Sequence, residues 1–114
     1  MKKSIFILCL LFLGFNFSAF AEYYNQNEAI SVQKLKTMKD DTYAIIEGFI
    51  IKKISDEKFL FKDETGEIVL DVDDDLMYQL KDIDKNTLVE VYGEFDKNIF
   101  GRHEFEVKKI TIIK

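Results

Sequence analysis

A chain of 114 residues in which 47% are hydrophobic can bury one compact core, but it is too short for two ordinary domains. Its 21 acidic residues outnumber its 16 basic residues, so the formal net charge is −5. This charge disfavours nucleic acids and strongly anionic membrane surfaces, because proteins bind both through clustered lysine and arginine. We therefore expect one small acidic domain that has no nucleic-acid partner.

The first 21 residues have the organisation of a cleavable export signal. Two lysines give a positive start, residues 5–15 are apolar without interruption, and Ala19 and Ala21 place small residues where a signal peptidase recognises them. An uncleaved anchor is the alternative, but the apolar run is shorter than the ~20 residues that span a bilayer. We expect cleavage after Ala21, which leaves residues 22–114 exported and not embedded in the membrane.

Residues 22–114 carry 14 basic and 21 acidic residues, one histidine and no cysteine, since Cys9 lies in the expected leader. Thiol nucleophiles, disulfides and cysteine-based zinc sites are thereby excluded from this part. Its only serines are Ser31 and Ser55, and its histidine has no evident base partner in the sequence. We therefore expect no catalytic residue, no enzyme activity and no cofactor.

The N-terminal part of residues 22–114 is expected to hold a flexible lead-in, residues 22–30, followed by the folded domain, residues 31–114. Ser31 is a suitable N-cap for a helix that ends near residues 40 and 41. The apolar face of this helix would carry Val32, Leu35 and Met38.

Strands are predicted from residue 43 onward, because β-branched and aromatic runs alternate there with short polar connectors. Gly48 is expected to bend the long first strand through a bulge or a sharp coil. Gly66 is expected to take a positive φ in the turn after the second strand. A short helix should begin at Asp74 and Asp75. The predicted strands are residues 43–54, 58–62, 67–73, 87–95 and 104–113.

The order of these elements predicts a mostly β protein. Five strands, a long bent first strand, and a short helix between strands three and four describe a five-stranded barrel of the oligonucleotide/oligosaccharide-binding type, the OB-fold. An N-terminal helix precedes the barrel. An SH3-like barrel and an open sheet are the alternatives.

Two sequence elements carry a resemblance to a known family. The turn Phe61-x-Asp63-x-Thr65-Gly66 and the acidic stretch at residues 71–75 follow one another within the predicted barrel. In this order the chain resembles the bacterial OB-fold (BOF) family of small exported proteins, over about residues 31–114. Where many members have a tryptophan after the acidic stretch, this chain has methionine and tyrosine. The resemblance implies a periplasmic, non-enzymatic protein that supports tolerance of envelope stress.

Four phenylalanines alternate along the predicted strands and have two possible roles. In OB-folds that bind single strands, exposed aromatic rings serve as stacking platforms. Here the rings share faces with aliphatic residues, and burying one contributes roughly 1.5–3 kcal/mol. We therefore expect a core composed in part of Phe59, Phe61, Phe95 and Phe105.

The candidate partner-binding face combines three groups of residues. Lys52, Lys58 and Lys62 would form a basic strip on the outside of the first two strands, with edge protection as the alternative role. Two aromatic residues lie off the expected core, and a basic pair lies in the connector between strands four and five. These further candidates are Tyr92, Phe100, Arg102 and His103.

The acidic stretch is the candidate for a metal site. Asp71, Asp73 and Asp75 match alternate ligand positions of a calcium loop, but Leu76 stands where such a loop requires glycine. Solvated carboxylates at a helix start are the simpler interpretation. We therefore predict no dedicated metal site.

Two functional hypotheses follow from these residues. The first is a binding or adaptor module that contacts an envelope protein or a cell-wall glycan through the barrel face and the loops at residues 55–57 and 96–103. The second is sequestration of cations or cationic peptides by the acidic stretch at residues 71–75. A hydrolase that uses two carboxylates is the least favoured, because no residue pattern identifies such a pair.

Overall fold

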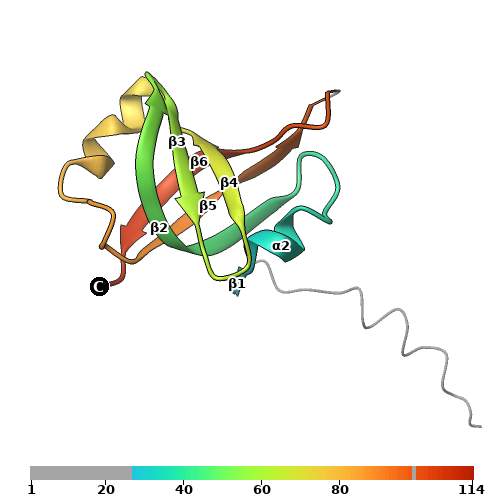
Figure 1. The fold of residues 1–114 in the computed structure, drawn as a ribbon, viewed down its shortest axis with the longest axis horizontal. Coiled ribbons are helices and arrows are strands. Elements are labelled where there is room, and N and C mark those ends of the chain that lie inside the picture. Colours follow the sequence, from blue (N-terminus) through green and yellow to red (C-terminus); the bar gives the residue numbers. More distant parts are fainter. Residues whose placement is uncertain (1–26, 99) are drawn as a thin grey trace, which may run out of the picture.

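The computed structural model describes residues 27–98 and 100–114 and shows a closed, mostly β barrel (Figure 1). The strand order is β1-β2-β3-β4-β6-β5, and β5 pairs again with β2, which closes the ring. The predicted mostly β, five-stranded OB-type barrel is therefore confirmed, with one short strand added. The strands are β1 (Ala29–Ile30), β2 (Tyr43–Ser55), β3 (Lys58–Lys62), β4 (Glu67–Asp71), β5 (Val89–Lys97) and β6 (His103–Ile112). The helices are α2 (Val32–Leu35) and the 3-10 helix η2 (Asp74–Leu80).

Strand β2 belongs to two walls of the barrel. Its first half pairs with β5, up to Gly48 opposite Val89, and its second half pairs with β3, from Phe49 opposite Lys62. Gly48 therefore lies where the strand changes partners, as expected for a strand that serves both sides of a closed sheet. The register irregularities lie further on, between Ile50 and Lys52 and between Lys53 and Ser55, so the bulge, one of the two expected ways of bending the strand, does not lie at Gly48.

The barrel interior is filled by the alternating apolar residues of all five long strands. Phe61, Phe95 and Phe105 are fully buried and Phe59 is 9% exposed, so the prediction that these rings form the core is confirmed. A role for the four rings as exposed stacking platforms is excluded by this burial. Buried side chains from α2 and from the segment after β4 complete the core, namely Val32, Leu35 and Val72.

Both predicted helices form, but in different lengths or geometry from those expected. Helix α2 is one turn long, because the chain tightens after Leu35, where Thr37 donates its amide and hydroxyl hydrogens to the Lys34 carbonyl. Met38 still packs on the core from the following turn. Helix η2 begins at Asp74, as expected, but it has 3-10 geometry, and its N-cap residue, Asp73, makes no side-chain capping bond.

The turn between β3 and β4 fastens the barrel to α2. Asp63 Oδ1 accepts hydrogen bonds from the Thr65 amide and hydroxyl, both 2.7 Å, and from the Gly66 amide, 3.0 Å. Asp63 Oδ2 accepts from the Val32 amide at 2.8 Å. Partial burial by itself would raise the pKa of Asp63, but these hydrogen bonds together hold it below its ordinary value. The expected positive φ at Gly66 is absent, and Gly101 is the glycine with that conformation within residues 27–98 and 100–114.

The structure describes only part of the N-terminal segment for which the sequence predicts a leader and a flexible lead-in. The expected leader, residues 1–21, and residues 22–26 of the lead-in lie outside the described residues. Ala29 and Ile30, at the end of the expected lead-in, instead form β1 and pair in parallel with Ile45 and Ile46. Among the residues that the structure describes, no helix has the length and apolar character needed to cross a membrane.

Candidate functional site

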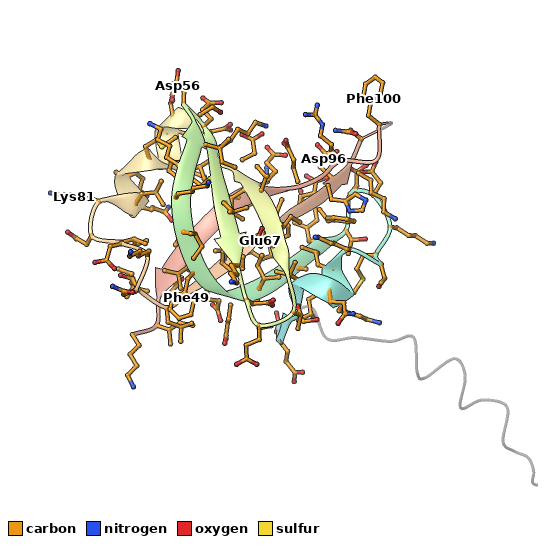
Figure 2. All side chains as sticks on the ribbon, in the orientation of Figure 1. Phe49, Asp56, Glu67, Lys81, Asp96 and Phe100 are labelled. Carbon is orange, nitrogen blue, oxygen red and sulfur yellow. The ribbon has the colours of Figure 1, made fainter. Side chains whose placement is uncertain are left out.

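A groove lies on the outside of the barrel between the β2–β3 turn and the β5–β6 hairpin. Figure 2 shows Asp56 and Phe100 at the tips of these two hairpins. The groove encloses about 310 Å³. This is the position, between two hairpin loops and over the second and third barrel strands, where OB-folds hold ligands. Its lining residues are Ile54, Lys58, Val69, Arg102, His103 and Glu104.

The floor of the groove is apolar. Ile54 at the end of β2 is 50% exposed, and Val69 faces outward from the centre of β4. The parallel pairing of β4 with β6 places Val69 directly beside Glu104, so the floor meets a charged edge there. Neither aliphatic residue was among the sequence candidates. The sequence feature that could have indicated this floor is Val69, the one apolar residue on an otherwise acidic strand face.

Lys58 is held in place by two carboxylates. Its Nζ lies 2.6 Å from Glu104 Oε1 and 3.6 Å from Asp71 Oδ2. The hydrogen bond to Glu104 raises the pKa of Lys58, against the effect of partial burial, and the charge of Asp71 adds to the increase. The positive charge of Lys58 is therefore already balanced within the protein.

Arg102 is the cation of the groove that remains available. Its side chain is exposed and makes no ion pair with any residue that the structure describes. The backbone around it is fixed, because the Arg102 amide donates to Asn98 Oδ1 at 3.1 Å and Gly101 takes a φ of 79°. A guanidinium group in this position can donate two parallel hydrogen bonds to a carboxylate.

His103 was expected in the connector, but it is the first residue of β6. It pairs with Lys97 across the β5–β6 hairpin, and its half-buried ring meets the Phe95 ring edge-on at 5.4 Å between centroids. This packing gives His103 a structural role at the rim of the groove. Within the described residues, no serine or threonine hydroxyl is hydrogen-bonded to it.

The structure brings together three of the seven predicted face residues, Lys58, Arg102 and His103. Phe100, 79% exposed, lies at the tip of the same hairpin but does not line the groove. Tyr92 lies on β5, where its ring stacks on Tyr43 at 5.9 Å, on the wall shared with β2. The other two predicted residues, Lys52 and Lys62, are exposed on β2 and β3 outside the groove, so the seven do not form one continuous face.

A group of carboxylates adjoins the groove at the β2–β3 turn. Oxygen atoms of Glu57, Asp71 and Asp73 all lie within 4.8 Å of one another. The negative charge of Asp74 raises the pKa of Glu57, and desolvation and Asp73 raise it further. Of the three sequence candidates, Asp71 and Asp73 are in this group and Asp75 is not. Glu57 was missed from the sequence because this residue lies in the β2–β3 turn, far from Asp71 and Asp73 along the chain. A hydrogen bond from the Val72 amide to the Glu57 carbonyl, 2.8 Å, holds the turn beside the end of β4.

The closed five-stranded barrel, with a groove between its two characteristic hairpins, defines a protein of the OB-fold class. Within that class, the chain belongs to the bacterial OB fold (BOF) protein family, whose model matches residues 16–112. The structure is similar to that of the hypothetical protein YgiW from Escherichia coli, with a TM-score of 0.70 and 31% identity over 75% of this chain and 90% of that one.

Two curated relatives show the same relationship in sequence. Protein YgiW of Escherichia coli is 36% identical over 80 residues, which are 70% of this chain and 60% of YgiW. The calcium-regulated OB-fold protein CarO of Pseudomonas aeruginosa is 33% identical over 75 residues, 66% of this chain and 63% of CarO. The chain thus matches about three fifths of the length of these two relatives. None of the names of the family or of these relatives describes an enzyme.

Proposed function

We propose that this protein is a non-enzymatic binding module of the bacterial periplasm, which holds an envelope partner in the groove between the β2–β3 turn and the β5–β6 hairpin. The observation that carries the proposal is the combination of an apolar floor, Ile54 and Val69, with the guanidinium of Arg102, which makes no ion pair with the described residues. The expected export signal supports the location, and the role in envelope stress that the family resemblance implies supports the physiological setting.

The chemistry of the groove narrows the class of partner. A guanidinium group without an ion pair to any described residue, beside an apolar floor, suits a ligand with a single carboxylate next to an aliphatic group. The carboxylates of Asp71, Glu104 and the nearby Glu57 disfavour a polyanion, since each further negative charge would be repelled. Cell-wall glycan fragments that carry short peptides have both the carboxylate and the aliphatic groups, and we therefore favour them over an envelope protein.

The first test is binding of soluble cell-wall fragments to the purified exported protein, followed by NMR at about 150 mM salt. Amide shifts are expected at Ile54, Val69 and Arg102, and Arg102→Gln should weaken binding about tenfold, the usual loss for one hydrogen bond to a charged group. The control, Lys85→Gln, removes a charge from an exposed loop elsewhere. Equal binding by both variants, or shifts outside the groove, would contradict this site.

A second candidate function is binding of a divalent cation by Glu57, Asp71 and Asp73, favoured by the mutual proximity of their oxygens. The name of the relative CarO, a calcium-regulated protein, supports a test with calcium. We expect a dissociation constant on the order of 10⁻⁴–10⁻³ M, as in extracellular calcium modules, and a large loss in Asp73→Asn. Asp75→Asn, which removes a neighbouring carboxylate outside the group, should bind normally. Heat of binding that disappears at physiological salt would show diffuse attraction only.

A further inference from the structure

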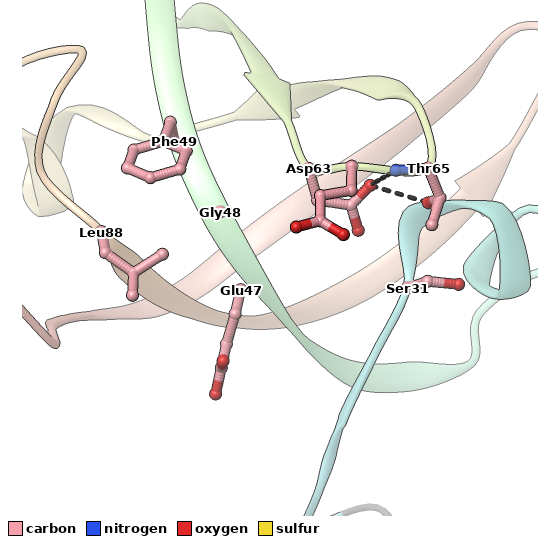
Figure 3. Close-up of a pocket in the computed structure, with 8 residues that line it drawn as sticks. Ser31, Glu47, Gly48, Phe49, Asp63, Thr65 and Leu88 are labelled. Atoms are coloured by element: carbon pink, nitrogen blue, oxygen red, sulfur yellow. Dashed lines mark hydrogen bonds between the residues drawn. The ribbon is translucent and has the colours of Figure 1, made fainter.

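A second cavity lies away from the groove, beside the middle of β2 (Figure 3). It encloses about 320 Å³ between β2, the β3–β4 turn and the segment that leads into β5. Phe49 and Leu88 provide its apolar side chains, and Figure 3 shows them on one side of the opening, with Asp63 and Thr65 opposite. Figure 2 places Phe49 far from the hairpin tips that flank the groove. The two hollows are therefore separate.

The charged residues around this cavity are nearly all acidic. Glu47, Asp63 and Glu64 line it, and none of its lining residues is basic. Asp63 is occupied by its four hydrogen bonds, whereas the exposed side chains of Glu47 and Glu64 have no hydrogen bond or ion pair with the residues described. Lys62 lines an adjoining hollow of about 230 Å³ together with Phe49, Asp63 and Glu64, but it makes no ion pair with the described residues.

The neighbouring strand adds a further negative charge. Glu47 of β2 lies directly opposite Glu90 of β5 in the antiparallel register. Like charges at directly opposed positions of a sheet are destabilising. Glu47 makes no hydrogen bond or ion pair with the residues that the structure describes, so no such contact offsets this repulsion. A cation placed in the cavity would relieve it.

We infer that this cavity receives an arginine side chain from a partner protein. Its guanidinium plane would lie against the Phe49 ring and donate hydrogen bonds to Glu47 and Glu64, while its methylene groups would contact Leu88. Arginine fits better than lysine, because a planar group stacks on an aromatic ring and bonds two carboxylate oxygens at once. The net charge of −5 would attract a basic partner to the protein.

The test uses a blocked five-residue peptide with a central arginine, titrated into the protein at about 150 mM salt and followed by NMR. Shifts are expected at Gly48, Phe49 and Leu88, with a dissociation constant on the order of 1 mM, as suits a single side chain. The isosteric citrulline peptide, which lacks the charge, should bind about tenfold more weakly, and the lysine peptide should lie between the two. Binding at the same site with equal affinity for citrulline would overturn the inference.

Variants test whether peptide binding depends on the carboxylates of this cavity or only on the overall negative charge of the protein. Glu47→Gln combined with Glu64→Gln should weaken the arginine peptide about tenfold. The control pair, Asp75→Asn with Asp82→Asn, removes the same charge from exposed positions elsewhere and should not. Phe49→Leu keeps an apolar wall without the ring and should reduce the preference for arginine over lysine to the part that comes from the two carboxylates. Equal losses in both charge pairs, or peptide shifts at Ile54 and Arg102, would overturn the inference. Equal losses in the two charge pairs would leave the proposal for cell-wall fragments in the groove unaffected, since none of these four residues lines it.

Discussion

Replacing Gly48 with alanine is expected to lower the free energy of unfolding by about 3 kcal/mol, the upper range for overpacking in a well-packed interior. A Cβ atom at this position would clash with the Lys62 carbonyl oxygen and would lie 2.9 Å from Phe61 Cζ. Neither neighbour can move easily, because one is strand backbone and the other is a fully buried ring. Urea denaturation would measure the loss, and the melting temperature should fall by about 10–25 °C for a domain of this size.

Gly66→Ala is the matched control for this substitution. A Cβ atom there would lie 3.7 Å from Val32 Cγ1, an ordinary van der Waals contact, and Gly66 does not have a positive φ. We expect a change of no more than about 0.5 kcal/mol, as for surface substitutions without a special backbone requirement. If Gly48→Ala proved as stable as Gly66→Ala, the close approach of β2 and β3 at the strand crossing would be refuted.

Asp63→Ala is expected to lower the free energy of unfolding by about 3 kcal/mol, because it removes the acceptor of four hydrogen bonds, and bonds to charged groups contribute roughly 1.5–3 kcal/mol each without being additive. Three successive amides at the start of α2 have side-chain acceptors, which are Asp63 for Val32, Thr65 Oγ1 for Gln33 and Ser31 Oγ for Lys34. Asp63→Asn should lose about 1–2 kcal/mol, since its amide nitrogen cannot accept from Val32. Denaturation at pH 7 would measure both losses.

The contribution of Asp63 should also depend on pH. The folded-state pKa of this carboxyl is lowered, so on acidification the unfolded chain binds the proton first. The stabilisation is therefore complete above the unfolded value of about 3.9 and is lost as the pH falls through the folded pKa. The stability difference between the wild type and Asp63→Asn should shrink between pH 5 and the lowest pH at which the protein folds.

The control for this pH dependence is Glu64→Gln, which removes the adjacent exposed carboxylate and should leave the profile parallel to that of the wild type. Taking the difference between variants also cancels the groups whose pKa is raised, such as Asp96, where desolvation and then Asp40 are the causes. These groups act in the opposite direction on acidification. A constant difference between wild type and Asp63→Asn at every pH would contradict the assigned hydrogen bonds.

The sequence predicted part of the candidate site and missed part of it, for different physical reasons. Arg102 and His103 were found because the hairpin loops of an OB-fold border its ligand face. Lys58 was found separately, as a residue of the expected basic strip on the outside of the first two strands. Ile54 and Val69 were missed because an exposed aliphatic residue has no distinctive chemistry. Glu57 joined Asp71 and Asp73 only through the pairing of strands that are distant in sequence.

Local pattern determined the strands and the core of this protein. The segment from Lys58 to Lys62 forms a strand with the predicted bounds, and its two phenylalanines are buried, because alternation with period two assigns each residue to a face before any partner strand is known. Tertiary structure decided the ends of the helices, the bond from Val32 to Asp63 across 31 positions, and the parallel register that sets Val69 beside Glu104. These features depend on contacts between segments far apart along the chain, and side-chain periodicity does not specify which strands pair or in which register.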